Sequence, residues 1–319
     1  MIISITGASG FIGRVLALRH IAQGDEVRVL TRKEPQKLAL PKSVRIFQGD
    51  LAAGTDSLTE FIDGSDILYH CAGEVRDPGL MRAVHVTGTR NLLGAAAHRI
   101  GRWVQLSSVG AYGPHREGIV SEKTPLNPLG EYELTKVESD RLVTEAAEEN
   151  GFSYAILRPS IVFGPGMPNR SLYQLIAMID RGLFFFIGAP GAAANYIYVD
   201  NVVDALLLCG YDPAARGRIY DLSDHASMED FIAMISDSLG RPHPKLRLPL
   251  APALCVARTV GRLSGFPLTE SRVHALTNRS VYATARIARE LGYSHEVSMR
   301  EGLRRTVDAW RKPPLQSPS

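Results

Sequence analysis

This 319-residue chain has few cysteines, only a small excess of positive over negative charge and no long apolar run. The three cysteines, Cys71, Cys209 and Cys255, are isolated and odd in number, which argues against a disulfide framework and against a structural zinc site. No stretch of about 18 apolar residues is present to cross a membrane. Lys+Arg 36 against Asp+Glu 33 leaves a net charge of only +3, without the basic stripe that nucleic acid requires. The N-terminus enters an apolar run at once, without the pattern of a signal peptide. We therefore expect a cytoplasmic protein with no metal site and with no nucleic-acid or membrane partner.

The chain opens with an apolar run that breaks into a glycine-rich turn. Residues 2–5 favour a strand buried on both faces, and apolar residues recur at helical spacing from Phe11 onward. Between them, Gly7, Gly10 and Gly13 are spaced as G-x-x-G-x-x-G. In this setting the glycines permit a tight turn, let a pyrophosphate approach the backbone and let the helix pack on the strand. The helix N-terminus adds unpaired N–H groups and about half a positive charge. This stretch predicts a dinucleotide-binding site.

Strands alternate with helical stretches over the first half of the chain. We expect strands at 26–31, 44–51, 66–73, 103–108 and 154–158, and helices at about 81–99 and 131–150. This alternation is typical of βαβ units, so the fold class is α/β: a Rossmann doubly wound parallel sheet with a smaller C-terminal α/β substrate-binding domain. Residues 1–163 form the dinucleotide-binding domain, to which 195–210 return. Residues 164–194 and 211–312 form the substrate-binding part, and 313–319 a disordered tail.

Later elements are weaker in the sequence. Residues 196–200 lead from a strand into a helix, 219–222 form a short strand and 228–239 a helix. The Phe184–Phe186 run favours core packing; a wall of the substrate pocket is the alternative.

Cofactor residues are expected where the parallel strands end, because ligands bind outside the carboxyl ends of such sheets. No acidic residue ends the second strand, where it would hold a ribose 2′-hydroxyl; Arg32 stands there and is suited to a 2′-phosphate. This favours NADP, with NAD possible and a solvated strand-end arginine as the alternative. The expected cofactor contacts in the glycine turn and at the strand ends are Gly7, Ser9, Gly10, Phe11, Ile12, Gly13, Arg32, Asp50, Leu51, Ala72 and Gly73.

Tyr132 and Lys136 lie one helical turn apart on one face of an expected helix. A tyrosine with a pKa of about 10 is a poor acid–base catalyst at neutral pH, and a neighbouring ammonium lowers that pKa. Lys136 can also hydrogen-bond the nicotinamide ribose of the cofactor. Ser108, at the end of the preceding strand, presents a hydroxyl that can hold a substrate oxygen as its charge changes. We therefore expect Ser108, Tyr132 and Lys136 to be catalytic.

Together these motifs resemble the extended short-chain dehydrogenase/reductases, the NAD(P)-dependent epimerase/dehydratase family. The resemblance covers nearly the whole chain: T-G-A-S-G-F-I-G at 6–13, G-D-L at 49–51, V-x-G-T-x-N-L-L at 86–93, L-S-S at 106–108, Y-x-x-x-K at 132–136, R-P at 158–159 and Y-V-D-N-V-V at 198–203. It implies that Tyr132 is the acid/base, that Lys136 supports it and that Ser108 positions the substrate. It also implies that Pro159 and Ile161 line the nicotinamide pocket, and that the protein is a homodimer joined through the helix of Y-x-x-x-K.

Departures from the family pattern narrow the range of reactions that we expect. Val109 and Gly110 stand where family dehydratases carry an acidic pair, and Ile161 stands where galactose-type epimerases carry an asparagine. The stretch 158–166 resembles 3β-hydroxysteroid-dehydrogenase-like and ketoreductase members. His85 replaces the asparagine that usually begins N-V-x-G-T, and a structural histidine is favoured over a proton-relay or substrate contact.

These features predict an NAD(P)-dependent oxidoreductase that interconverts a secondary alcohol and a ketone. We favour reduction of a nucleotide-linked 4-keto sugar, for which Asn169, Arg170 and Asn195 are candidate phosphate contacts. The alternatives are a nucleotide-sugar epimerase with tightly bound NAD and a 3β-hydroxysteroid-type dehydrogenase with an apolar substrate. A cofactor-binding scaffold without catalysis is disfavoured by the intact Ser–Tyr–Lys set.

Overall fold

A seven-stranded parallel sheet is the centre of the computed structural model, which describes residues 1–38, 40–54, 56–259 and 269–312. In spatial order its strands are β3 (Arg45–Gln48), β2 (Glu26–Thr31), β1 (Ile2–Thr6), β4 (Ser65–His70), β5 (Ile100–Leu106), β7 (Ser153–Pro159) and β11 (Arg218–Leu222). Except in the edge strand β3, their β-branched and apolar runs are largely buried on both faces, as a sheet covered by helices requires. The expected Rossmann sheet is confirmed.

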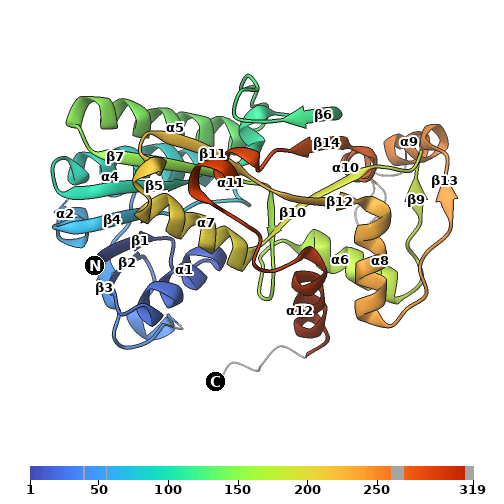
Figure 1. The fold of residues 1–319 in the computed structure, drawn as a ribbon, viewed down its shortest axis with the longest axis horizontal. Helices are drawn as coiled ribbons and strands as arrows, with labels where there is room; N and C mark the ends of the chain where they lie inside the picture. The colour runs from blue at the N-terminus through green and yellow to red at the C-terminus, as the bar shows by residue number, and fades with distance from the viewer. Residues whose placement is uncertain (39, 55, 260–268, 313–319) are drawn as a thin grey trace.

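Helices cover both faces of this sheet (Figure 1). On one face α1 (Phe11–Ala22), α7 (Val199–Tyr211) and α11 (Ala285–Leu291) share a core with β1 and β7. On the other face lie α2 (Asp56–Ile62), α4 (Gly88–Ala96) and α5 (Glu131–Asn150). The glycine turn and the carboxyl ends of the strands all face the remaining part of the chain, so that edge is where a ligand can lie.

A smaller α/β part lies beyond those strand ends, on the right of Figure 1. Its helices are α6 (Arg170–Asp180), α8 (Met228–Leu239), α9 (Leu250–Thr259), α10 (Glu270–Thr277) and α12 (Met299–Arg311). Its strands form a three-stranded sheet of β8 (Ile161–Phe163), β10 (Ala193–Tyr198) and β12 (Asp224–Ser227), and two pairs: β9 (Phe186–Ile187) with β13 (Arg247–Leu248), and β6 (Glu117–Val120) with β14 (Arg279–Tyr282). Phe184 and Phe186 meet edge to face at 5.1 Å in its apolar core, as core packing predicts.

Three expectations need correction. Residues 218–222, assigned from the sequence to the substrate part, form β11 and complete the large sheet beside β7. The helix expected at 81–99 is interrupted: α3 (Pro78–Arg82) passes through a π-helical turn, Ala83–Thr87, into α4. The strand expected at 44–51 ends at Gln48, because residues 49–54 turn around the Asp50 side chain, which accepts from the Ala52 N–H at 3.0 Å. The tail at 313–319 lies outside the described residues.

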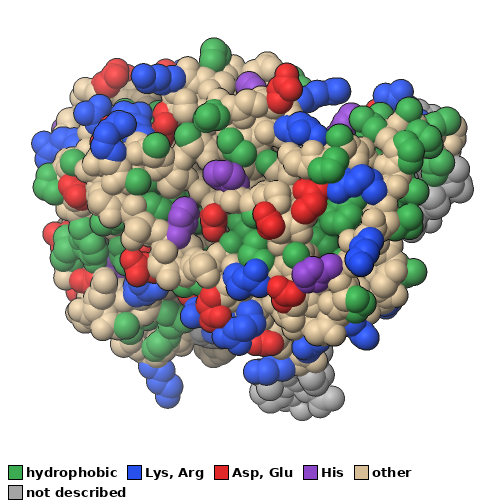
Figure 2. Space-filling model, turned by 45° about the vertical axis from the view of Figure 1, so that its right-hand side comes forward, with side chains coloured by type: hydrophobic (Ala, Val, Ile, Leu, Met, Phe, Trp, Pro, Cys, Tyr) green, Lys and Arg blue, Asp and Glu red, His purple; other side chains and the backbone are tan. Residues whose placement is uncertain are grey.

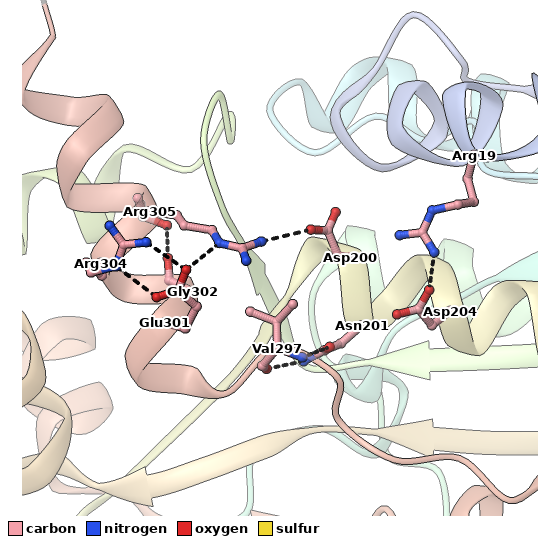
Figure 3. A network of polar contacts seen from close by, with 10 residues as sticks. Arg19, Asp200, Asn201, Asp204, Val297, Glu301, Gly302, Arg304 and Arg305 are labelled. Atoms are coloured by element: carbon pink, nitrogen blue, oxygen red, sulfur yellow. Dashed lines mark hydrogen bonds and ion pairs between the residues drawn. The ribbon is translucent and has the colours of Figure 1, made fainter. Parts of the chain in front are cut away.

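The motif at 198–203 contacts the C-terminal helix α12 and the segment before it (Figure 3). The Asn201 amide donates to the Val297 carbonyl at 2.7 Å and accepts from the Val297 N–H at 3.0 Å. Arg305 of α12 reaches Asp200 at 3.6 Å, and a Cβ on Gly302 would stand 2.7 Å from the Tyr198 ring. The motif therefore serves packing between α7 and α12 rather than the cleft.

Charges of both signs are interspersed on the face drawn in Figure 2. No helix among the described residues is long and apolar enough to span a membrane.

Candidate active site

A cleft of about 1800 Å³ opens between the carboxyl ends of the large sheet and the smaller part. Every residue that the sequence predicts for the site lines it. These residues are Gly7, Ser9, Gly10, Phe11, Ile12, Gly13, Arg32, Asp50, Leu51, Ala72, Gly73, Ser108, Tyr132, Lys136, Pro159 and Ile161. Residues more than 100 positions apart in the chain thus meet at one place.

The glycine turn has the shape that a dinucleotide requires. A Cβ on Gly13 would stand 2.5 Å from the Gly7 carbonyl oxygen, so α1 can approach β1 this closely only with glycine. A Cβ on Gly10 would meet only the Gly7 carbonyl oxygen, at 3.1 Å, so this position opens into the cleft. No described side chain caps the start of α1, which leaves its first N–H groups available to a phosphate.

Arg32 follows β2 at the far end of the same cleft. Its side chain is exposed and has no ion-pair partner among the described residues. The nearest acidic residue in sequence, Glu34, instead pairs with Lys37 at 3.1 Å. A free guanidinium at this strand end is suited to a phosphate on the adenosine ribose.

Ser108, Tyr132 and Lys136 come together from two neighbouring elements. Ser108 lies two residues after the end of β5 and caps a 3-10 turn, Val109–Tyr112; its hydroxyl accepts from the Gly110 N–H at 3.1 Å. Tyr132 lies in the first turn of α5 and shares a hydrogen bond with Ser108. Lys136 is buried one turn later and donates to the Leu106 carbonyl. A phenol, a hydroxyl and an ammonium therefore line the same cleft.

The electrostatics of the trio differ from the expectation that Lys136 lowers the tyrosine pKa. Burial raises the pKa of Tyr132 to about 12, and the hydrogen bond from Ser108 offsets only part of that rise. Burial also lowers the pKa of Lys136, while the nearby Asp140 carboxylate opposes this shift. The ammonium is directed at Leu106 rather than at the phenol, so Tyr132 is a protonated acid at neutral pH.

A buried polar network beneath the trio was not foreseen from the sequence. The Asp140 carboxylate accepts from the Ser107 hydroxyl at 2.8 Å and pairs with Arg158 at 3.0 Å. Arg158 also donates to the Tyr112 hydroxyl at 3.2 Å, which in turn donates to Asp221 at 2.8 Å. Asp140 lies one turn after Lys136 on α5, and this spacing was the available signal. The network joins α5, β7 and β11 with the segment that follows β5, directly behind the site.

The substrate side of the cleft is predominantly apolar. Its lining includes Leu175, Ala193, Ala194, Tyr196, Met228, Phe231, Ala275 and Leu276. Among the described residues beyond 160 that line the cleft, Arg170 is the single charged one.

The three candidate phosphate contacts have different surroundings. Asn169 caps α6 by accepting from the Ser171 N–H at 2.8 Å, and Asn195 donates to the Ser280 carbonyl at 2.8 Å. Arg170 is exposed at the start of α6. All three residues therefore line the cleft, but the side chains of Asn169 and Asn195 are already engaged in hydrogen bonds within the protein.

Comparison with known proteins places the chain among relatives of one family. A model described as "NAD dependent epimerase/dehydratase family" matches residues 3–223. A 4-hydroxy-2-methyl-3-oxo-4-farnesyl-3,4-dihydroquinoline-1-oxide ketoreductase from Stigmatella aurantiaca is 29% identical over 94% of this chain and 93% of its own. Human short-chain dehydrogenase/reductase family 42E member 1 is 27% identical over 91% of this chain and 82% of its own.

Solved structures share the fold. The UDP-glucuronic acid 4-epimerase from Bacillus cereus in complex with NAD superimposes with a TM-score of 0.76 at 21% identity, covering 98% of this chain and 96% of the other. The UDP-glucose 4-epimerase from Thermotoga maritima has a TM-score of 0.76 at 20% identity, covering 98% of this chain and 99% of the other.

Proposed function

This chain belongs to the NAD dependent epimerase/dehydratase family, and we propose that it reduces a ketone on a largely apolar substrate to a secondary alcohol. It is an NAD-dependent oxidoreductase or epimerase of the extended short-chain dehydrogenase/reductase type. One observation carries the more specific proposal: a protonated phenol and a serine hydroxyl line a cleft whose substrate side is predominantly apolar.

The trio has distinct roles in this proposal. A bound nicotinamide dinucleotide supplies the hydride. The Tyr132 hydroxyl donates its proton to the substrate oxygen as that oxygen gains charge. The Ser108 hydroxyl, oriented by the Gly110 N–H, holds the same oxygen. Lys136, whose ammonium is directed at the end of β5, holds the cofactor's ribose in place.

The protonation state of Tyr132 supports the reductive direction. With a pKa of about 12, the phenol carries its proton at neutral pH and is ready to act as an acid. The oxidative direction needs the phenolate, which burial disfavours. A protonated phenol in the free enzyme is in keeping with the reductive direction.

NADP is the proposed cofactor, because the exposed Arg32 guanidinium is available to a 2′-phosphate and no carboxylate follows β2 directly. NAD carries an uncharged 2′-hydroxyl in place of the 2′-phosphate, so it would gain little binding free energy from the Arg32 guanidinium. NAD would remain a substitute of lower affinity.

An apolar ring ketone fits the substrate side better than a charged one. A diphosphate brought into this cleft would meet Arg170 as the single charged side chain from the described residues beyond 160. Anions bound in low dielectric need several donors or cations to offset their lost hydration. The ketoreductase relative, whose name includes a farnesyl quinoline oxide, is in keeping with an apolar substrate.

A nucleotide-linked 4-keto sugar is the second candidate, favoured by Arg170 at the N-terminus of α6, where backbone N–H groups add donors. An epimerase acting on such a sugar would keep its cofactor bound through each cycle. The solved UDP-sugar epimerases share the fold of this chain.

Cofactor content separates these possibilities. We expect freshly purified protein to be free of cofactor and to bind NADPH more tightly than NADH in fluorescence titrations. NAD retained at one equivalent per chain through dialysis would instead support the epimerase and would contradict the role of Arg32.

We further propose that the protein is a cytoplasmic homodimer. The three cysteines are free thiols in the structure, in keeping with a reducing compartment. α5 presents a partly exposed face that a second copy could cover. Size-exclusion chromatography with light scattering tests the oligomeric state.

A further inference from the structure

His85 occupies the π-helical turn between α3 and α4, and its ring is 1% exposed. Its Nε2 accepts from the Glu74 N–H at 2.9 Å. Its Nδ1 lies 2.8 Å from the Thr135 hydroxyl, which itself donates to the Glu131 carbonyl at 2.7 Å. An amide N–H can only donate, so Nε2 is bare and the ring proton is on Nδ1, directed at Thr135. One tautomer satisfies every partner.

The same ring touches the proposed acid. The His85 and Tyr132 rings meet edge to face, with centroids 5.6 Å apart and planes at 81°. Tyr132 and Thr135 are both on α5, whereas Glu74 belongs to the loop after β4 that lines the cofactor side of the cleft. A single side chain thus connects the cofactor loop with the catalytic helix.

The loop that His85 holds is itself ordered and reaches across the cleft. The Glu74 carboxylate accepts from the N–H groups of Val75, Arg76 and Asp77, at 2.9, 2.7 and 3.2 Å. Arg76 then donates to the Pro168 carbonyl at 3.2 Å, in the turn before α6. Because the loop folds around Glu74, the bond from its N–H to His85 sets where the whole loop stands.

A proton relay through this ring is disfavoured by its surroundings. Burial, with the nearby Lys136 ammonium, lowers the pKa of His85 to about 3, so the ring is neutral at working pH. Both ring nitrogens are already occupied by Glu74 and Thr135. The ring therefore keeps this hydrogen-bond pattern at working pH, as a fixed support requires.

We propose that His85 is a positioning residue, which holds the Gly73–Glu74 loop of the cofactor site in register with the Tyr132 ring. This role rests on the proposed function, because it presumes that a nicotinamide dinucleotide lies against that loop. It differs from a purely structural role in one respect: the bond to Glu74 governs cofactor affinity, not stability alone.

Two substitutions test the roles of the two His85 ring nitrogens separately. In His85→Gln, the amide oxygen reaches the Nε2 position and can accept from Glu74. In His85→Asn, the shorter amide reaches only the Nδ1 position, so the Glu74 N–H loses its partner. We expect the NADPH dissociation constant to rise about tenfold in H85N and less than about threefold in H85Q. At saturating NADPH, kcat should fall in both variants, because both lose the ring edge against Tyr132.

The measurement is NADPH fluorescence titration without substrate, paired with thermal unfolding midpoints. His20→Gln is the matched control, because this histidine is equally buried but bonds Asp25 outside the cleft. It should lower the midpoint and leave the dissociation constant unchanged. Equal dissociation constants in H85N and H85Q would overturn the proposal.

Thr135→Val extends the test if H85N does not fold. It removes the partner of Nδ1 and leaves His85 and Glu74 in place, so we expect the NADPH dissociation constant to rise about threefold. An unchanged value would contradict the coupling between the loop and α5. Failure of the presumed cofactor site is recognised separately, because the unsubstituted protein would then bind neither NADPH nor NADH.

Discussion

The two walls of the cleft are built from different materials. The cofactor wall consists of backbone turns and polar side chains that are held by buried partners: Lys136 donates to the Leu106 carbonyl, and Ser107 donates to Asp140. The substrate wall consists mainly of apolar side chains from β10, α8 and α10, continuous with an apolar core. Fixed polar groups suit a reaction whose geometry must not vary. The substrate preference of an apolar wall can change through the size of its side chains alone. The residues that carry out the reaction are therefore separable from those that select the substrate.

The largest effect should come from removing the acid on the cofactor wall. Tyr132→Phe should reduce turnover about a thousandfold, because general acid catalysis by a positioned group contributes roughly that much. NADPH affinity should remain near that of the unsubstituted protein.

Tyr196→Phe is the matched change on the substrate wall. This ring stacks on Phe231 with centroids 4.6 Å apart, so the variant keeps the aromatic contact and should keep turnover within about threefold. Comparable losses of kcat in the two variants would show that the walls do not divide chemistry from specificity.

The second effect concerns the cofactor end of the cleft. Arg32→Ala should weaken NADPH binding about thirtyfold, the loss expected for a charge-assisted phosphate contact, and leave NADH binding unchanged. Lys37→Ala is the control, since this neighbouring cation already pairs with Glu34. Titrations with both cofactors measure the effect, and an equal change for NADPH and NADH would argue against a 2′-phosphate contact.

A smaller effect tests the apolar character of the substrate wall. Ala275 is exposed and lines the cleft on α10. Ala275→Arg should lower kcat/KM for an apolar ring ketone about tenfold, because a cation there must lose water when such a substrate binds. Ala275→Leu adds bulk without charge and should change the value less. If the arginine variant instead gains activity on apolar ketones, the substrate proposal is wrong.

The smallest effect lies in the buried network behind the cofactor wall. Burial raises the pKa of Asp221 from 3.8 to about 7. The folded protein therefore binds this proton more tightly than the unfolded chain, so ionisation of Asp221 lowers stability as the pH rises from about 4 to about 7. Asp221→Asn removes this titration, so the loss of stability over that pH range should be smaller in the variant.

Urea unfolding at pH 5 and pH 8 measures that change. Asp63→Asn, at a carboxylate with 71% of its side chain exposed, is the control. If the two variants have the same pH dependence as the unsubstituted protein, Asp221 is not protonated in the folded state at pH 5.

The same division of the cleft explains what the sequence could predict. The cofactor wall is encoded by short local patterns: glycines at fixed spacing, strand ends and one turn of helix between Tyr132 and Lys136. Each of these patterns could be recognised from the sequence without knowledge of the tertiary structure, and the predicted site residues all line one cleft.

The substrate wall is assembled from β10, α8 and α10, which are far apart in the chain, so no local pattern identifies Met228, Phe231 or Ala275 as neighbours. β11 was misassigned for a related reason: a short strand carries no signal for the sheet it joins. The raised pKa of Tyr132 depends on burial, and that is a property of the folded protein.

The most direct test of the account is the consumption of NADPH with two substrates side by side, an apolar ring ketone and a UDP-linked 4-keto sugar. We predict one equivalent of NADPH oxidised per alcohol formed with the ring ketone, little turnover of the sugar, and loss of the reaction in Tyr132→Phe. Interconversion of UDP-sugar epimers with no net NADPH consumption, by protein that retains bound NAD, would contradict it.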